Sequence, residues 1–421
     1  MQTPTGRIPS TIAGVGRGAL AFVARQRWNF KIVALRRALG DFATGLTEQY
    51  QSIYIVALGA DPVQLGSVNS VGSAVGALIA VPLGWMADRY SPRGIFIFGS
   101  LLLVFSPLLY AVAPTWQFVI VAMLVHSVAF RFLHTGCQVI CAESLKDADR
   151  ATGKSACGTG ASVLHLLGIA VAPFLITAFG GLKVEGIRPL YWVQFAVYTG
   201  TLLLLVTRLR RTPLSAESQA GGTLLGGIRE VFAGGAALKR WIAVFTLSQM
   251  SMTLVAPFTQ LFAHQVKGAD QYVLAGRATA ASLVGLVVGI PLGLLADRIG
   301  RKRVLYMIAP LYWAALVLLI LAPTPGILIF SGVLQGFWRA SFLISSAMTA
   351  EMVPIKHMGR WTGIITLFGG LISTPAPILG GIMWERLGPA SVFIAAVAID
   401  ALVRIPLLTT IPETLARGKP R

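Results

Sequence analysis

Residues Val81–Arg89 read V-P-L-G-W-M-A-D-R, and residues Ile290–Arg298 read I-P-L-G-L-L-A-D-R. The two stretches lie 209 positions apart, which is about half of the 421-residue chain. Each stands where a long apolar run meets a group of arginines. A chain that repeats such a boundary at half its length is predicted to be a duplicated membrane protein.

The composition supports this prediction along the whole chain. Hydrophobic residues make up 55% of it and the mean hydropathy is +0.73, both high for a soluble domain. Apolar runs of about 20 residues, long enough to cross a bilayer as helices, recur throughout. The sequence therefore predicts an all-α membrane protein with twelve transmembrane helices, at 37–58, 64–87, 94–113, 117–141, 154–179, 190–207, 241–263, 273–296, 303–322, 326–350, 361–384 and 389–410.

The repeat extends beyond the two opening stretches. Further matches occur at offsets of 208 or 209: Leu58–Asp61 with Lys267–Asp270, Arg131 with Arg339, and Glu143 with Glu351. We therefore expect two parallel repeats of six helices, related by an axis along the membrane normal. The expected parts are an N-terminal tail (1–36), a first bundle (37–207), a linker (208–240), a second bundle (241–410) and a C-terminal tail (411–421).

The net charge of +19 is distributed unevenly across the expected membrane. An even number of helices puts both termini on one side, and 27 of the 35 Lys and Arg residues fall on that side. Only Lys183, Arg188, Lys267 and Arg386 fall on the opposite side. This positive-inside pattern predicts a cell-membrane protein with both termini in the cytoplasm. The basic composition then reflects topology and the lipid surface, and nucleic-acid binding is not expected.

No pattern in the sequence predicts a metal, a cofactor or an enzyme. The three cysteines give no disulfide framework, and Cys137 and Cys141 have no nearby acid or histidine to complete a metal site. Neither H-E-x-x-H nor G-x-S-x-G occurs. A membrane sensor without transport activity is an alternative, although it would normally add a soluble output domain.

The longer form of the repeated stretch carries a family resemblance. Residues Gly293–Lys302 read G-L-L-A-D-R-I-G-R-K and match the loop signature G-x-x-x-D-R-x-G-R-K of the major facilitator superfamily. The first copy, Gly84–Arg93, has Ser91 in place of the second glycine. The chain resembles this superfamily over essentially its whole length. The resemblance implies a secondary transporter that works by alternating access, with helices 1, 4, 7 and 10 around a central cavity.

The signature residues are interpreted as a gate at the cytoplasmic membrane boundary. Glycines without side chains allow a neighbouring helix to approach closely. The resemblance implies that Asp88 faces the start of helix 11, where the helix dipole favours negative charge. The alternative is that these charges only mark topology. The expected gating residues are Gly84, Asp88, Arg89, Arg93, Gly293, Asp297, Arg298, Arg301, Glu143 and Glu351.

Ionisable residues at bilayer depth are costly unless paired or hydrated, so they mark candidate sites. The spacing of Asp41, Thr44, Glu48 and Gln51 puts them on one face of helix 1, and Ser127, Arg131, His134 and Gln138 share a face of helix 4. A rise of 1.5 Å per residue places Glu48, Arg131 and His165 at one level, roughly 15 Å from the helix ends. That level is the middle of the membrane, where transporters of this fold bind their cargo.

We interpret Glu48 as the coupling carboxylate, Arg131 as its partner, and Asp41 as a relay that passes the proton to the cytoplasm. Burial favours a protonated acid and a nearby arginine favours an ionised one, so substrate entry can release the proton. The alternative is a static Glu48–Arg131 ion pair that locks helices 1 and 4 together.

Eight residues are candidate substrate contacts: Arg131, Arg339, His134, His165, Gln138, Gln51, Tyr50 and Trp338. Arg339 suits an anionic cargo group or a backbone carbonyl. Trp338 can stack on a flat or cationic ligand or pack in the core. The two histidines can bind cargo, relay protons or simply line the cavity. Asp400 and Arg404, at i and i+4 in helix 12, are expected to form a structural pair.

The transport direction is predicted from partial motifs. Arg131 and the stretch Gly168–Pro173 resemble motifs of proton-driven exporters in part, while the Gly-Gly ending of the second motif stands in helix 11, at Pro377–Gly381. The expected function is proton-coupled export of a small amphipathic or drug-like molecule by a monomer, with the substrate, protons and the lipid bilayer as partners. The alternative is uptake or facilitated diffusion of a small metabolite or organic anion.

Overall fold

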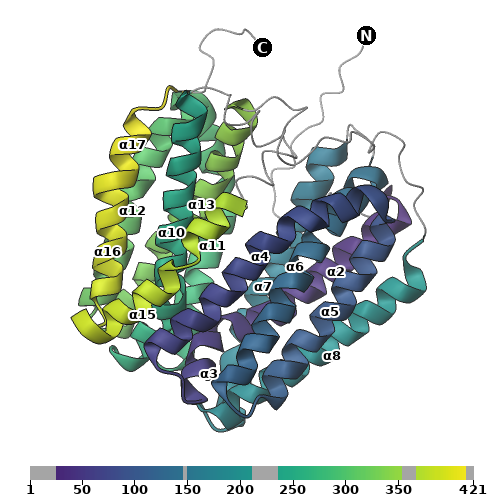
Figure 1. Ribbon diagram of the computed structural model, residues 1–421, viewed down its shortest axis with the longest axis horizontal. Coiled ribbons are helices and arrows are strands. Elements are labelled where there is room, and N and C mark those ends of the chain that lie inside the picture. The colour runs from purple at the N-terminus through teal and green to yellow at the C-terminus, as the bar shows by residue number, and fades with distance from the viewer. Residues whose placement is uncertain (1–24, 146–148, 211–235, 353–366, 414–421) are drawn as a thin grey trace, which may run out of the picture.

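The computed structural model describes residues 25–145, 149–210, 236–352 and 367–413. Within these ranges the chain is helical apart from short turns, and no strand occurs (Figure 1). Eleven helices in the described ranges are long and apolar enough to cross a membrane. The predicted all-α membrane fold is confirmed. The expected tails, apart from residues 25–36 and 411–413, and most of the expected linker lie outside the described residues.

Within the described residues each half of the chain contains six helical segments, and the first and last segments each consist of three labelled elements. The first half contains α2 (Trp28–Thr47), η1 (Glu48–Tyr50), α3 (Gln51–Ala57), α4 (Pro62–Arg89), α5 (Pro92–Val112), α6 (Trp116–Ser144), α7 (Arg150–Ala178) and α8 (Val184–Arg208). The second contains α10 (Ala236–Gln265), α11 (Gln271–Ile299), α12 (Arg301–Leu321), α13 (Pro325–Met352), helical residues 367–373 continued by α15 (Ala376–Leu387), and α16 (Ser391–Ile399), η5 (Asp400–Arg404) and α17 (Ile405–Thr409).

The first helix begins at Trp28, earlier than the expected residue 37. Phe30 and Val33 are fully buried, and the Trp28 indole N–H donates to the carbonyl of Arg208 at the end of α8. These contacts extend the helix through a charged stretch that hydropathy alone assigns to the N-terminal tail. A single turn of 3₁₀-helix, Glu48–Tyr50, then separates the 20 residues of α2 from the 7 residues of α3, so the first transmembrane segment is broken nearer its second end.

The repeated turn Leu58–Asp61 and Lys267–Asp270 has the same structure in both halves. Gly59 and Gly268 adopt φ angles of +95° and +67°, a region that favours glycine. The carboxylates of Asp61 and Asp270 then accept backbone N–H groups at the start of α4 and α11, at 2.7 and 2.8 Å. The sequence repeat is therefore a turn followed by a helix N-cap.

The two copies of the loop signature differ where their sequences differ. Gly300 has a φ angle of +109°, which only glycine adopts readily. Ser91 has a φ angle of −59° and its hydroxyl accepts the N–H of Gly94, so it caps α5 instead. The serine therefore changes the turn and still supplies a helix start.

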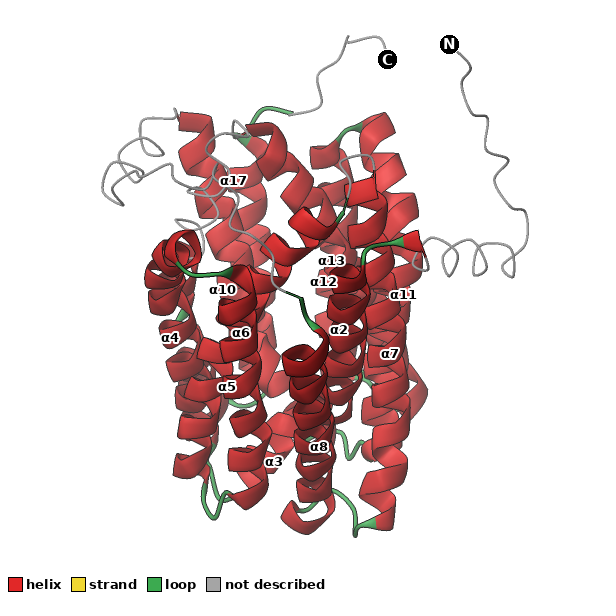
Figure 2. Cartoon of the chain, turned by 90° about the vertical axis from the view of Figure 1, so that its right-hand side faces the viewer, coloured by secondary structure: helices red, strands yellow, loops and turns green. Residues whose placement is uncertain are grey.

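The two halves converge at the end where α3 and α15 lie and separate toward the end where α2 begins (Figure 1). Side-on, the helices run in a common direction, as in a membrane bundle (Figure 2). At the converging end α4 and α15 touch backbone to backbone, because a Cβ on Gly66 would collide with the carbonyl of Pro377 and a Cβ on Gly381 with that of Pro62. We call this contact the α4–α15 seam. Pro377 and Gly381, from the glycine–proline stretch of helix 11, therefore lie in a contact between the two halves.

Candidate functional site

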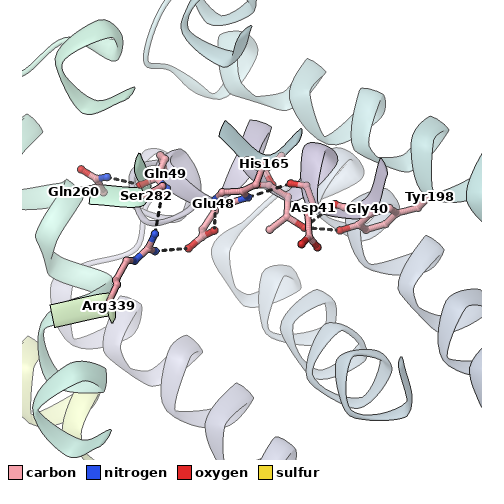
Figure 3. A network of polar contacts seen from close by, with 11 residues as sticks. Gly40, Asp41, Glu48, Gln49, His165, Tyr198, Gln260, Ser282 and Arg339 are labelled. Atoms are coloured by element: carbon pink, nitrogen blue, oxygen red, sulfur yellow. Dashed lines mark hydrogen bonds and ion pairs between the residues drawn. The ribbon is translucent and has the colours of Figure 1, made fainter. Parts of the chain in front are cut away.

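The site begins where α2 and α7 approach each other without side chains between them. A Cβ on Gly45 would collide with the carbonyl of His165, and a Cβ on Gly168 with that of Phe42. This approach brings the His165 ring beside the end of α2. Its Nδ1 lies 3.1 Å from the carbonyl oxygen of Asp41, and its Nε2 lies 3.7 Å from Oε2 of Glu48 (Figure 3).

The contact with a carbonyl assigns the tautomer of His165. A carbonyl oxygen only accepts hydrogen bonds, so Nδ1 carries a proton and donates. The Nε2 that faces Glu48 is then an acceptor in the neutral ring and a donor in the charged ring. An ionised Glu48 therefore matches a charged His165, and a protonated Glu48 matches a neutral one. At 3.7 Å the two groups are near enough for a charge contact but not for a hydrogen bond.

Glu48 also reaches across to the second half of the chain. Its Oε1 lies 3.8 Å from Nη2 of Arg339 on α13, and Nη1 of the same arginine donates to the Ser282 hydroxyl on α11 at 2.9 Å (Figure 3). The side chains of Glu48 and Arg339 are 43% and 41% exposed, so the pair is solvated and its attraction is weak. A weak contact between the halves can break and re-form at little cost.

Two cavities meet at this ion pair. One, of about 250 Å³, lies among η1, α10, α11 and α13 and is lined by Gln51, Trp338 and Arg277 among others. The other, of about 580 Å³, is lined by Asp41, His165, Ser282 and neighbouring small residues of α7 and α11. Glu48 and Arg339 line both. A molecule passing from one cavity to the other would therefore pass these two charges.

Asp41 shares the larger cavity with Glu48, as the one-face spacing predicts. Its Oδ2 lies 4.0 Å from Nε of Arg37, one turn away, and both side chains are more than 40% exposed. Asp41 therefore lies between Glu48 and the start of α2, where a proton relay would need it.

The expected contact between Glu48 and Arg131 does not form. The Arg131 guanidinium instead lies over Gly76 on α4, where its Nε would be 3.6 Å from an added Cβ. Arg339, its repeat mate, takes the place beside Glu48. The sequence could not show which arginine pairs with Glu48, because the two arginines occupy equivalent positions in the repeat. In the structure the Glu48 side chain points toward the second half, and so it meets Arg339.

The other expected substrate contacts divide into three groups. Gln51, His165, Trp338 and Arg339 line the cavities. Tyr50 is fully buried, and its hydroxyl donates to the carbonyl of Gln271, so it joins the halves at the converging end. Arg131 and His134 line neither cavity, and His134 stacks beside the exposed ring of Phe130. The side chain of Gln138 lies outside the described residues.

Sequence reasoning missed most residues of the smaller cavity, among them Arg277, Tyr312 and Gln335. Arg277 is 3% exposed; its Nε donates to the Ser331 hydroxyl at 3.1 Å and its Nη2 to the amide oxygen of Gln335 at 2.8 Å. One signal was available, since Arg277 is among the four basic residues within the expected spans. It lies near the start of α11, where arginine is commonly a surface residue.

Part of the expected gate is assembled at the second loop signature. Nη2 of Arg301 lies 3.4 Å from Oδ1 of Asp297 and 2.7 Å from Oε1 of Glu351. Arg93 donates to the carbonyl of Val206. An added Cβ on Gly293 would meet nothing within 4 Å, so the expected close helix approach is not seen there. The side chains of Gly84, Asp88, Arg89 and Glu143 fall outside the description, and Arg298 has no ion pair with a described residue.

The expected pair of Asp400 and Arg404 is present and buried. Arg404 donates to both carboxylate oxygens of Asp400 within a turn of π-helix, and the Trp313 indole N–H donates to Asp400 Oδ2 at 2.7 Å. The guanidinium carbon of Arg404 lies 4.9 Å from the ring centre of Trp338. The pair therefore supports a residue of the cavity wall.

The chain matches known proteins in sequence. The model of the family described as Major Facilitator Superfamily matches residues 38–277 and 277–420. An uncharacterised MFS-type transporter of Mycobacterium tuberculosis is 30% identical over 204 residues, 45% of this chain and 28% of that protein. The multi-drug resistance efflux pump PmrA of Streptococcus pneumoniae is 28% identical over 178 residues, 41% of this chain and 44% of that protein. The chain thus spans less than half the length of these relatives.

Solved structures show the same fold over nearly the whole chain. The nucleoside transporter NupG superposes with a TM-score of 0.74 at 15% identity, covering 90% of this chain and 98% of that one. A D-xylose–proton symporter gives a TM-score of 0.69 at 14% identity, covering 92% and 99%. Because the family model matches both halves of the chain and this fold agrees with it, the chain belongs to the major facilitator superfamily and is a multi-pass membrane protein.

Proposed function

We propose that the chain is a proton-coupled exporter of small amphipathic or drug-like molecules, and that Glu48 is the group whose proton is exchanged for cargo. The observation that carries the proposal is the position of Glu48 between His165 of its own half and Arg339 of the other half. An ionised Glu48 attracts both partners, and a protonated Glu48 loses the ion pair to Arg339. Its protonation state therefore bears directly on a contact between the two halves.

The same turn carries contacts that keep the converging end together. Next to Glu48, Gln49 accepts a hydrogen bond from Gln260 of α10, and Tyr50 donates to the backbone of Gln271 on α11. Glu48, Gln49 and Tyr50 all belong to η1, so a movement of this turn changes the Glu48–Arg339 pair and the contacts at the converging end together. This shared element is a physical route by which proton binding can alter which end is open.

The positive-inside pattern supports the direction of transport that we propose. It supports a topology with the termini, and with them the separated end of the bundle, in the cytoplasm. Asp41 and the larger cavity then lie on the cytoplasmic side of Glu48, where cargo to be exported enters and protons leave. Export is further supported by the similarity to PmrA, which is named a multi-drug resistance efflux pump. We also infer that the protein works as a monomer in the cell membrane.

Uptake or facilitated diffusion of a small metabolite or organic anion is the second candidate; the buried cation Arg277 in the smaller cavity favours an anionic cargo in either direction of transport. Proteoliposomes separate the two. The full chain is reconstituted and offered fluorescent amphipathic dyes of positive, neutral and negative charge. An antiporter accumulates dye when the lumen is the more acidic side. Accumulation when the bath is the more acidic side indicates symport, and equilibration without accumulation indicates facilitated diffusion; either result contradicts the proposal.

A further inference from the structure

Arg277 is a cation held in the wall of the smaller cavity without a carboxylate. Its hydrogen-bond partners among the described residues, the Ser331 hydroxyl and the Gln335 amide oxygen, are neutral. None of the ion pairs between described residues includes it. A Cβ on Gly332 would collide with the carbonyl of Arg277, so α13 packs against it by backbone contact. The guanidinium is therefore fixed in place rather than free to reach the membrane surface.

The same half offers a direct comparison. Arg404 is also 3% exposed, and it donates to both oxygens of the buried Asp400. Arg339 has Glu48. A buried charge costs several kcal/mol unless it is paired, and intramembrane charges are normally matched or hydrated. Arg277 departs from this rule and lines a cavity, which points to a counter-ion that arrives with the cargo.

The charges that line the cavity agree with this reading. They are Glu48, Arg277 and Arg339. Glu48 and Arg339 compensate each other, which leaves one positive charge at Arg277. A single negative charge on the cargo would restore neutrality, and a bidentate anion such as a carboxylate matches the planar guanidinium.

Two further buried donors line the same cavity without partners. The Tyr312 hydroxyl and the Trp338 indole N–H make no hydrogen bond within the described residues, and their side chains are 1% and 6% exposed. Their rings stack with centres 4.3 Å apart. Buried polar atoms of this kind are normally satisfied, so a ligand with acceptor atoms would complete the site once a small shift of the rings opens these donors to the cavity. Because Tyr312 and Arg404 cover the faces of the Trp338 ring, an apolar ring in the cavity would meet this stack at its edges.

We propose that the smaller cavity binds an aromatic acid with one negative charge, its carboxylate on Arg277 and its ring beside Tyr312 and Trp338. This rests on the proposed function in taking the cavity as the cargo site. Arg277, Tyr312 and Trp338 determine the substrate class. Asp400 and Arg404 are positioning residues, because the guanidinium of Arg404 lies against Trp338.

Thermal stabilisation of the purified full chain tests this with three probes that share one ring system: 2-naphthoate, 2-naphthamide and 2-naphthylmethylammonium. We expect the naphthoate to raise Tm at concentrations of about 1 mM, and the other two to have little effect. Arg277→Gln should weaken naphthoate binding about tenfold or more, since a charge-assisted bond is lost. Tyr312→Phe keeps the ring and removes one donor, so it should weaken binding less. Arg386→Gln, an exposed site, is the matched control.

The proposal is overturned if naphthamide or the ammonium compound stabilises the chain as well as naphthoate does, or if naphthoate gives no shift. It is also overturned if Arg277→Gln binds naphthoate as the unaltered chain does. Should Arg277→Gln not fold, Tyr312→Phe and Arg277→Lys are measured instead, and naphthoate binding unchanged in both contradicts the assignment. Proton-driven transport of a neutral or cationic dye alone would sink this inference and leave the proposed exporter intact. Naphthoate binding without any proton-driven transport would do the reverse.

Discussion

Glu48 and Arg339 come from opposite halves of the duplicated chain, yet their charged groups lie 3.8 Å apart between the two cavities. The repeat gives Glu48 no acidic counterpart, because the matching position in the second half is Pro257. Arg339 does have a counterpart, Arg131, which is not paired with Glu48. The duplication therefore produced two similar bundles with one asymmetric charge contact between them.

The choice between the two arginines is open to a double-mutant cycle. Glu48→Gln is combined with Arg339→Gln and, separately, with Arg131→Gln, and the free energy of unfolding is measured by denaturation in mixed micelles. We expect a coupling energy of about 0.2–1 kcal/mol with Arg339, since both side chains are solvated, and none beyond error with Arg131. Larger coupling with Arg131 would show that the contact in the structure is not the one that matters.

The α4–α15 seam predicts a strong effect of side-chain volume. Gly66→Val places a side chain against the carbonyl of Pro377, and overpacking of this kind typically costs about 1–3 kcal/mol. The variant should unfold at a lower temperature, and a spin-label pair across the seam should report a longer distance. Gly200→Val is the control, since a Cβ on that helical glycine meets nothing within 4 Å. Equal effects of the two substitutions would exclude the seam as the cause.

The buried pair in helix 12 predicts a large and repairable loss of stability. Asp400→Asn leaves Arg404 buried without its counter-ion, which typically costs about 3–5 kcal/mol. Replacing both residues by apolar ones of similar size, as in Asp400→Leu with Arg404→Met, should recover much of the loss. Tm of the purified protein reports both. A double variant no more stable than Asp400→Asn would mean that the pair itself, rather than the isolated charge, is required.

The assembled part of the gate predicts an effect on rate rather than on binding. Arg301→Gln removes the contacts to Asp297 and Glu351, which we take to re-form during each transport cycle. Dye transport should slow while the Kd of a bound dye stays unchanged. Arg386→Gln, an exposed site outside the expected gate, should transport at the normal rate. If Arg301→Gln instead changes the Kd alone, the cluster is part of the binding site.

The fold could be predicted from the sequence because hydropathy, the repeat offset and the loop signature agree. The turns before α4 and α11 follow from Gly59 and Gly268 with the aspartates that come after them. The start of α2 could not be predicted, since it depends on packing of Phe30 and Val33 against distant segments. Tertiary contact overrides local composition there.

The candidate site was predictable as a set of residues and unpredictable as a set of contacts. Depth within the helix identifies Glu48 and His165, and the repeat offset identifies Arg339 as the counterpart of Arg131. Which arginine meets Glu48 depends on how the two halves lie together. The approach of Gly45 and Gly168, which puts His165 beside Glu48, likewise appears only in the structure. Arg277 escaped notice because its burial is a property of the packed bundle.

The coupling role of Glu48 is tested most directly by Glu48→Gln in proteoliposomes, with dye accumulation followed while the lumen is held more acidic than the bath. Glutamine keeps the size and polarity of the side chain and cannot carry the proton. We predict that this variant loses accumulation against the gradient and still exchanges dye at equal pH, while Glu385→Gln, an exposed site, accumulates normally. A Glu48→Gln variant that accumulates dye as the unaltered protein does would contradict the assignment.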